Sequence, residues 1–147
     1  MDRETQGLLN DLNTAIIQLR GIYSVWARQQ GLSYNEMLVL YTIRDCGFCT
    51  QKQLSDAYLL PRQTIHHVIS SMRAQGLLEL CEGCCAGREK AFALTEKGRE
   101  YAAPFLASLN EVEERAANQF GLVKLQKIAQ LVMEYNRVLE DVTGALH

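Results

Sequence analysis

Apolar and polar positions change their spacing several times along residues 50–98, and each change marks a new short element. Thr50 and Gln53 form a T-x-x-Q capping box, which predicts a helix that begins at Gln51. Pro61 ends that helix, because the residue before a proline is pushed out of the α region while proline itself fits the first turn of a new helix. The pattern predicts two helices joined by a short turn.

The second of these helices has one apolar and one polar side. Its inward side is predicted to consist of Ile65, Val68, Ile69 and Met72. Its outward side carries Arg62, Gln63, Thr64, His66, His67, Ser70 and Arg73. Glutamine can read adenine and arginine can read guanine through paired hydrogen bonds, so this face suits a DNA major groove. The alternative is a face that is merely solvated.

A β-hairpin is predicted directly after the second helix. Gly76 suits the end of that helix, and residues 77–81 and 90–95 read as two strands around a polar tip at residues 82–89. Arg88 and Lys90 are placed where a wing can reach backbone phosphates or a neighbouring minor groove, although they would also make a hairpin more soluble. Together these elements predict a winged helix-turn-helix.

Long apolar stripes flank this region. The N-terminal stripe contains Leu8, Leu12, Ala15, Ile16, Leu19, Ile22, Tyr23 and Trp26. The C-terminal stripe contains Leu122, Leu125, Ile128, Ala129, Val132, Tyr135 and Leu139. We expect both helices to mediate dimerisation, the alternative being that they pack within one monomer. Ser33 is expected to cap a further helix. Residues 96–120 read as a long helix that ends at Gly121. Pro104 should kink this helix unless the proline begins a new first turn.

The charge distribution favours DNA binding more than the total charge does. The chain of 147 residues has a net charge of −2. Residues 50–99 contain seven Lys and Arg against five Asp and Glu, so they carry +2 while the remainder carries −4. This surplus is small. Tight binding would therefore rest on directed contacts and on two copies of the chain acting together.

The sequence resembles the MarR family of transcriptional regulators over nearly its whole length. The resemblance rests on residues 60–65, on Gln75-Gly76-Leu77-Leu78, and on the passage from Gly87 to Gly98. It implies one domain over residues 1–147, mostly α with a small β-hairpin wing, in which residues 1–30 and 100–147 form dimerisation helices and residues 33–99 the winged helix. Family members usually carry Asp-x-Arg in the wing, and here Ala86 stands at the acidic position while Arg88 matches the arginine.

The resemblance also implies a function. We expect a homodimer that binds double-stranded DNA at an inverted repeat with half-sites about one helical turn apart. Repression is expected rather than activation, with release by a small molecule, a metal or an oxidant. Family members often bind aromatic ligands in a cleft, which Tyr23, Trp26 and Tyr41 would line here, unless these aromatic residues are simply core.

The five cysteines are the feature in which this sequence differs most from a typical MarR-family sequence. Cys46 and Cys49 form one C-x-x-C pair, and Cys81, Cys84 and Cys85 follow in the wing. Three interpretations stay open: ordinary reduced cysteines, redox or soft-metal sensing, and a structural zinc site, although no cofactor is required. For sensing, we expect the helix that begins at Gln51 to lower the pKa of the Cys49 thiol.

Other classes of protein fit less well. No phosphate loop, nucleophile elbow or thioredoxin-like βαβ pattern is present, so we do not expect an enzyme. A winged helix that binds proteins without binding DNA is the remaining alternative, which the polar helix face disfavours. The absence of a signal peptide and of an apolar stretch long enough to span a bilayer predicts a cytoplasmic, soluble protein with no membrane partner.

Overall fold

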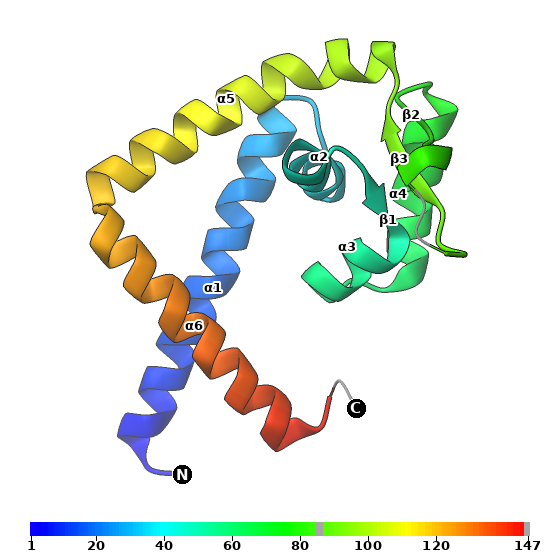
Figure 1. The fold of residues 1–147 in the computed structure, drawn as a ribbon. Coiled ribbons are helices and arrows are strands. Elements are labelled where there is room, and N and C mark those ends of the chain that lie inside the picture. Colours follow the sequence, from blue (N-terminus) through cyan, green and yellow to red (C-terminus); the bar gives the residue numbers. More distant parts are fainter. Residues whose placement is uncertain (85–86, 146–147) are drawn as a thin grey trace. The chain divides into compact units, whose positions relative to one another are not determined.

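The computed structural model describes residues 1–84 and 87–145. Its helices and strands follow the order shown in Figure 1. The elements are α1 (Arg3–Gln29), α2 (Tyr34–Cys46), β1 (Cys49–Thr50), α3 (Gln51–Tyr58), α4 (Arg62–Ala74), β2 (Leu78–Leu80), the 3-10 turn η1 (Glu82–Cys84), β3 (Ala91–Leu94), α5 (Glu96–Phe120) and α6 (Leu122–Thr143). The mostly helical fold with a small β wing confirms the predicted class.

The predicted capping box at Thr50 and the predicted cap at Ser33 are both present, and Ser33 also forms a capping box. Ser33 and Glu36 cap α2 reciprocally, and Thr50 and Gln53 do the same for α3. Each box satisfies backbone amides that the first helical turn would otherwise leave without partners. Helix α3 ends at Tyr58, just before the turn that leads to Pro61, so the predicted helix-turn-helix is confirmed.

Helix α4 ends in a Schellman motif that turns the chain into the wing. The amide of Gly76 donates to the carbonyl of Arg73, and the amide of Leu77 donates to the carbonyl of Met72, both at 2.9 Å. Gly76 has a φ of +73°, which glycine adopts without the steric penalty that a side chain would bring. The chain therefore passes from α4 to β2 through only three residues, 75–77.

The wing sheet has three antiparallel strands in the order β1-β3-β2. In this register Cys49 and Leu80 both pair with Phe92, from opposite sides of β3. The strands are shorter than the sequence predicts, because a 3-10 turn follows β2 directly. Cys49 lies within the short strand β1.

The core of the winged helix lies between α2, α3, α4 and the sheet. Fully buried side chains include Leu40, Leu54, Ile65, Ile69 and Met72. The predicted inward side of α4 is thereby confirmed, and α3 and α4 lie against the strands as Figure 1 shows.

The chain divides into two compact units, Met1–Leu106 and Ala107–His147. The division falls within α5, whose bounds match the prediction and which continues through Pro104. Gly121, with a φ of +103°, separates α5 from α6 as predicted. In the described part of the chain, no helix combines the length and the apolar character needed to cross a bilayer.

Candidate nucleic-acid interface

The polar side of α4 is open to solvent. Arg62, Gln63, His66, His67, Ser70 and Arg73 are exposed, and Thr64 is half-buried. Because Ile65, Val68, Ile69 and Met72 fix the opposite side in the core, the helix cannot rotate without exposing them. The fold therefore presents these polar side chains in one fixed orientation.

Side-chain hydrogen bonds hold His66 in place on this face. Its Nδ1 lies 3.3 Å from Gln51 Nε2, and its Nε2 lies 3.5 Å from Ser70 Oγ. An amide NH₂ group only donates, so His66 Nδ1 accepts from Gln51 and His66 Nε2–H donates to Ser70. Gln51, the first residue of α3, thus belongs to the candidate interface, which the sequence analysis missed.

Arg73 has a partner within the winged helix. Its guanidinium lies 5.4 Å from the centre of the Phe92 ring on β3. This cation–π contact links the end of α4 to the middle strand of the sheet. Arg73 remains exposed, but part of its role is to join the helix and the wing.

A cavity of about 570 Å³ lies between the start of α2 and the polar side of α4. It is lined by Ser33, Asn35, Glu36, Gln63, Thr64, His67, Val68 and Ser71. The first three residues come from the N-terminal end of α2. From the sequence, Ser33 was interpreted only as a helix cap, whereas the fold brings it beside the polar face of α4.

The wing carries two exposed cations and one acidic anchor. Arg88 and Lys90 are exposed, as predicted. Between them, the carboxylate of Glu89 accepts a hydrogen bond from the backbone amide of Lys52 at 3.1 Å. Lys52 lies in the first turn of α3, where a carboxylate satisfies an orphan amide and opposes the positive end of the helix dipole. Glu89 therefore ties the base of the wing to α3. Ala86 lies outside the described residues.

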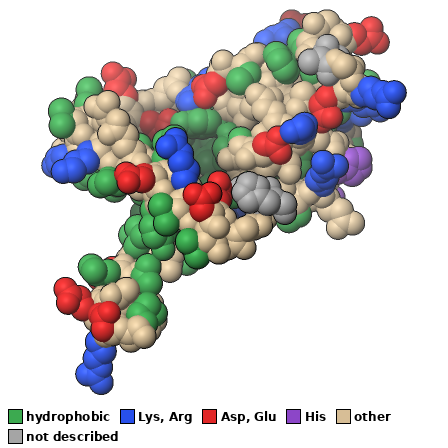
Figure 2. All heavy atoms as spheres, turned by 60° about the horizontal axis from the view of Figure 1, so that its bottom comes forward, with side chains coloured by type: hydrophobic (Ala, Val, Ile, Leu, Met, Phe, Trp, Pro, Cys, Tyr) green, Lys and Arg blue, Asp and Glu red, His purple; other side chains and the backbone are tan. Residues whose placement is uncertain are grey.

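The surface charge is mixed rather than broadly basic. On the face shown in Figure 2, Lys and Arg side chains stand apart from one another among acidic and uncharged groups. Binding to a polyanion would therefore depend on a few placed cations and hydrogen-bonding groups.

The arrangement of two short helices, a wing and long flanking helices has a solved counterpart. The structure of NMB1585, a MarR family regulator from Neisseria meningitidis, matches the chain with a TM-score of 0.83 and 32% sequence identity. The match covers 93% of this chain and 96% of that protein. The chain belongs to the MarR family.

Other solved structures share the fold at lower identity. A MarR/EmrR family transcriptional regulator from Acinetobacter sp. ADP1 is 16% identical, with a TM-score of 0.75, over 95% of this chain and 99% of that one. NadR, solved in complex with 4-hydroxyphenylacetate, is 15% identical, with a TM-score of 0.64, over 92% of this chain and 93% of that one. No protein-family model and no curated protein sequence matches the chain. Membership in the MarR family makes the chain a DNA-binding transcriptional regulator.

The aromatic residues expected to line a MarR effector cleft have separate surroundings. The Trp26 ring lies 5.2 Å from the Phe105 ring, centre to centre. The guanidinium of Arg44 lies 4.1 Å from the centre of the Tyr41 ring. Trp26 also lines an open cavity of about 680 Å³ along α1, together with Gln18, Gly21, Ile22, Val25 and Gln29. Tyr23 and Tyr41 are not among the residues that line this cavity.

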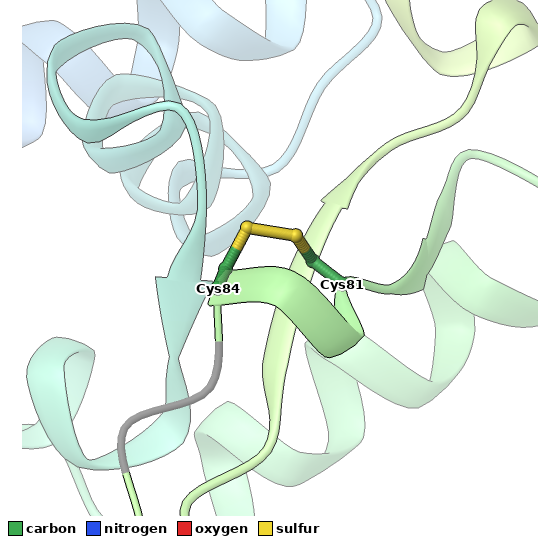
Figure 3. Close-up of a disulfide and its surroundings, with 2 residues drawn as sticks. All are labelled: Cys81 and Cys84. Atoms are coloured by element: carbon green, nitrogen blue, oxygen red, sulfur yellow. A yellow bond between two sulfur atoms is a disulfide. The ribbon is translucent and has the colours of Figure 1, made fainter.

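The cysteines of this MarR-family chain fall into two kinds. Cys81 and Cys84 form a disulfide across η1 (Figure 3). Cys46 and Cys49 are free thiols, the first exposed and the second completely buried. Cys85 lies outside the described residues. Among residues 1–84 and 87–145, no three His, Cys, Asp or Glu side chains gather in a way that suits a metal ion.

The expectation that the helix dipole lowers the pKa of Cys49 is wrong. Burial, with a smaller contribution from the charge of Cys46, raises the pKa of the Cys49 thiol to about 12. The sequence places Cys49 close to the start of α3, but the side chain points into the core, where desolvation of a thiolate outweighs the dipole.

Cys49 is therefore expected to resist alkylation in the folded protein. After reduction, iodoacetamide at mildly alkaline pH should modify Cys46 quickly and Cys49 only when denaturant is added, because the thiolate is the reactive form. Peptide mapping by mass spectrometry measures both sites in one sample, and Cys46→Ser identifies the fast-reacting site. Equal rates at Cys46 and Cys49 without denaturant would contradict the buried position of Cys49.

Proposed function

We propose that the chain is a homodimeric repressor that binds an inverted-repeat operator and is released from it by an effector. The observation that carries the proposal is the two-sided α4, whose buried apolar side fixes a polar side next to a wing with two exposed cations, Arg88 and Lys90. In this arrangement Arg62, Gln63 and Thr64 meet base edges in the major groove, with His66, His67, Ser70 and Arg73 further along the helix. Arg88 and Lys90 contact backbone phosphates.

Exposed apolar side chains support the homodimer. On α1, Leu8 is 65% exposed and Ile22 is 68% exposed, and on α6, Ile128 is 50% exposed. Stripes of this kind along two long helices exceed the scattered apolar residues that are normal on a monomer surface. A two-fold dimer buries them and sets two α4 helices at a fixed separation, which is why the operator is an inverted repeat.

Release requires an effector that binds the two states of the dimer with different affinities. The NadR structure holds 4-hydroxyphenylacetate, a small aromatic acid. By analogy, we place a small-molecule effector near Trp26, which lines the cavity along α1, with Tyr23 and Tyr41 as further candidates. No metal or other cofactor is needed for the DNA-binding step itself.

Two kinds of alanine variant separate base reading from phosphate contact. Arg62→Ala or Gln63→Ala is expected to weaken operator binding by about 1–3 kcal/mol and to relax the preference for one base pair, because each removes hydrogen bonds to a base edge. Arg88→Ala is expected to weaken binding to all duplexes similarly and to reduce the salt dependence. Titrations by fluorescence anisotropy on the operator and on single-substitution operators measure these effects.

Arg3→Ala is the matched control, since it removes one exposed arginine outside the winged helix. It should leave affinity and base preference nearly unchanged. Equal losses on every duplex for Arg62→Ala, Gln63→Ala and Arg88→Ala would contradict the role of α4. If no duplex is bound with salt-dependent affinity, a protein-interaction module becomes the better interpretation.

A further inference from the structure

The disulfide in the wing closes a tight turn directly after β2. Cys81 and Cys84 have Cα atoms 5.3 Å apart, and the amide of Cys84 donates to the carbonyl of Cys81 at 3.1 Å. Figure 3 shows the bridge spanning the two ends of η1, which occupies Glu82–Cys84. The turn removes these three residues from any pairing with β3.

The register of the sheet predicts a second conformation for the same residues. Leu78 pairs with Leu94, Leu80 pairs with Phe92, and one more hydrogen bond of the same register joins the Cys81 amide to the Ala91 carbonyl at 2.9 Å. Two steps further, Gly83 would pair with Glu89, and Cys84 with Arg88.

The residue before Arg88 is already suited to the end of a hairpin loop. This residue is Gly87, which has a φ of +67°. Three-residue hairpin loops commonly end with a left-handed residue of this kind, usually glycine. In the longer hairpin, Glu82 would also lie opposite Lys90, so that an acidic and a basic side chain form a cross-strand pair. The sequence of the wing therefore supports an extended hairpin as well as the turn.

The two conformations exclude each other. In a strand, Cα atoms three residues apart are separated by about 10 Å, and their side chains point to opposite faces of the sheet. A disulfide requires Cα atoms within about 7 Å and side chains that point toward each other. Cys81 and Cys84 can therefore be bonded in the turn but not in the extended hairpin.

Access also distinguishes these two cysteines from their neighbour in the sheet. Cys81 and Cys84 are partly exposed, whereas Cys49 is completely buried. A small reagent can reach the wing pair without opening the core. Breaking the disulfide also leaves the buried side chains that hold β2 and β3, such as Leu78 and Phe92, in place.

We propose that Cys81 and Cys84 are a reversible redox site that selects between two wing conformations. The oxidant class is a low-molecular-weight disulfide, RSSR. The Cys84 thiolate attacks one sulfur of RSSR and releases RS⁻, and the Cys81 thiolate then attacks the Cys84 sulfur of the mixed disulfide and releases the second RS⁻. The two cysteines lose two electrons, RSSR gains them, and the two cysteine protons end on the two RSH products.

The dithiol form has the extended hairpin and is the tighter DNA binder. Extension places Arg88 beside the tip of a longer wing, whereas the disulfide withdraws the strand that supports it. This consequence rests on the proposed function, because it requires the wing to contact DNA. In a reducing compartment the regulator would hold its operator, and a rise in small disulfides would release it.

The conformational part is tested without DNA, by NMR on the full chain in dithiothreitol and after treatment with oxidised glutathione. The dithiol form should show a contact between the Hα atoms of Glu82 and Lys90 and slower hydrogen exchange at the Gly83 and Glu89 amides. Both signatures should be absent in the disulfide form, while the Hα contact between Leu80 and Phe92 persists as an internal reference. The same wing spectra in both forms, or a fully oxidised sample that lacks the Cys81–Cys84 bond, would overturn the proposal.

The functional part is tested by titrating the operator with both forms. Oxidation should weaken binding about tenfold, the scale expected for losing a phosphate contact in each half-site, and dithiothreitol should restore it. Cys84→Ser, which removes the attacking thiolate, should bind like the dithiol form under both conditions, and the control Cys46→Ser should respond like the unaltered chain. A response that survives in Cys84→Ser, equal affinities, or tighter binding by the oxidised form would overturn the proposal. If neither form binds any duplex, the proposed function fails, and the NMR result still decides whether the wing switches.

Discussion

Ile128→Glu is expected to separate the dimer into folded monomers and to remove most of the operator affinity. Ile128 lies on α6 and is 50% exposed in the single chain, so a carboxylate there meets water in the monomer. In the dimer the same carboxylate would be buried against apolar side chains, which is strongly unfavourable without a partner charge.

Separation of the dimer acts on DNA binding through effective concentration. Two linked reading heads bind the second half-site intramolecularly, and this advantage amounts to about 10²–10⁴ in affinity. Light scattering coupled to size-exclusion chromatography gives the mass, and anisotropy titration gives the affinity. Circular dichroism should show nearly unchanged helix content, since half of the Ile128 side chain already lies in water in the single chain.

Gln126→Glu is the matched control for Ile128→Glu. It places the same carboxylate on the same helix at an exposed polar position two residues earlier, on the other side of the helix. It should stay dimeric and bind the operator nearly as well as the unaltered chain. A dimeric Ile128→Glu variant with full affinity would contradict the proposed interface.

Gly98→Ala is expected to destabilise the winged helix by about 2–4 kcal/mol. A Cβ atom at this position would lie 2.0 Å from the carbonyl oxygen of Leu77 and 2.9 Å from its carbonyl carbon. The neighbour is backbone, so no side chain can move aside. The Leu77 carbonyl also accepts a hydrogen bond from the Thr95 amide at 3.0 Å, so a shift would break the junction between β2 and α5.

The hydrogen bonds around Thr95 explain why this junction is so close. The Thr95 hydroxyl donates to the Gly76 carbonyl at 2.6 Å and accepts from the Gly98 amide at 2.9 Å. It therefore caps α5 and ties the helix to the turn that ends α4. The stretch from Leu94 to Gly98 contains the two residues that this junction requires: Thr95 for its hydroxyl group, and Gly98 because it has no Cβ atom.

Gly7→Ala is the control for Gly98→Ala. Gly7 lies within α1, and a Cβ there would meet no atom within 4 Å. Alanine should stabilise the helix by about 0.5–1 kcal/mol, because glycine loses more backbone entropy in a helix. Urea denaturation at one protein concentration measures both variants. A Gly98→Ala variant as stable as Gly7→Ala would contradict the close backbone approach.

Local contacts account for the elements that the sequence predicted well. The capping boxes at Ser33 and Thr50 join residues three apart, and the turn at Pro61 follows from the ring of one residue. The apolar side of α4 is a periodic pattern within one helix. These features therefore need no knowledge of the rest of the chain.

The candidate site depends on contacts between distant residues, and there the sequence was less informative. The hydrogen bond between Glu89 and Lys52 joins residues 37 positions apart in the sequence, and the one between Gln51 and His66 joins residues 15 positions apart. Cys49 was placed correctly beside a helix start, but its burial depends on strand β3 on the other side of the motif. The turn at Cys81–Cys84 interrupts a stretch whose residues also favour a strand, so composition alone could not choose between them.

DNA reading by two copies of the chain is tested most directly by a selection of the reduced protein against a random pool of DNA duplexes, followed by titration of the enriched sequence at several salt concentrations. We expect enrichment of an inverted repeat with half-sites about one helical turn apart, bound more weakly as salt rises. A pool that remains random at low salt would contradict the claim that two copies of α4 and the wing read DNA.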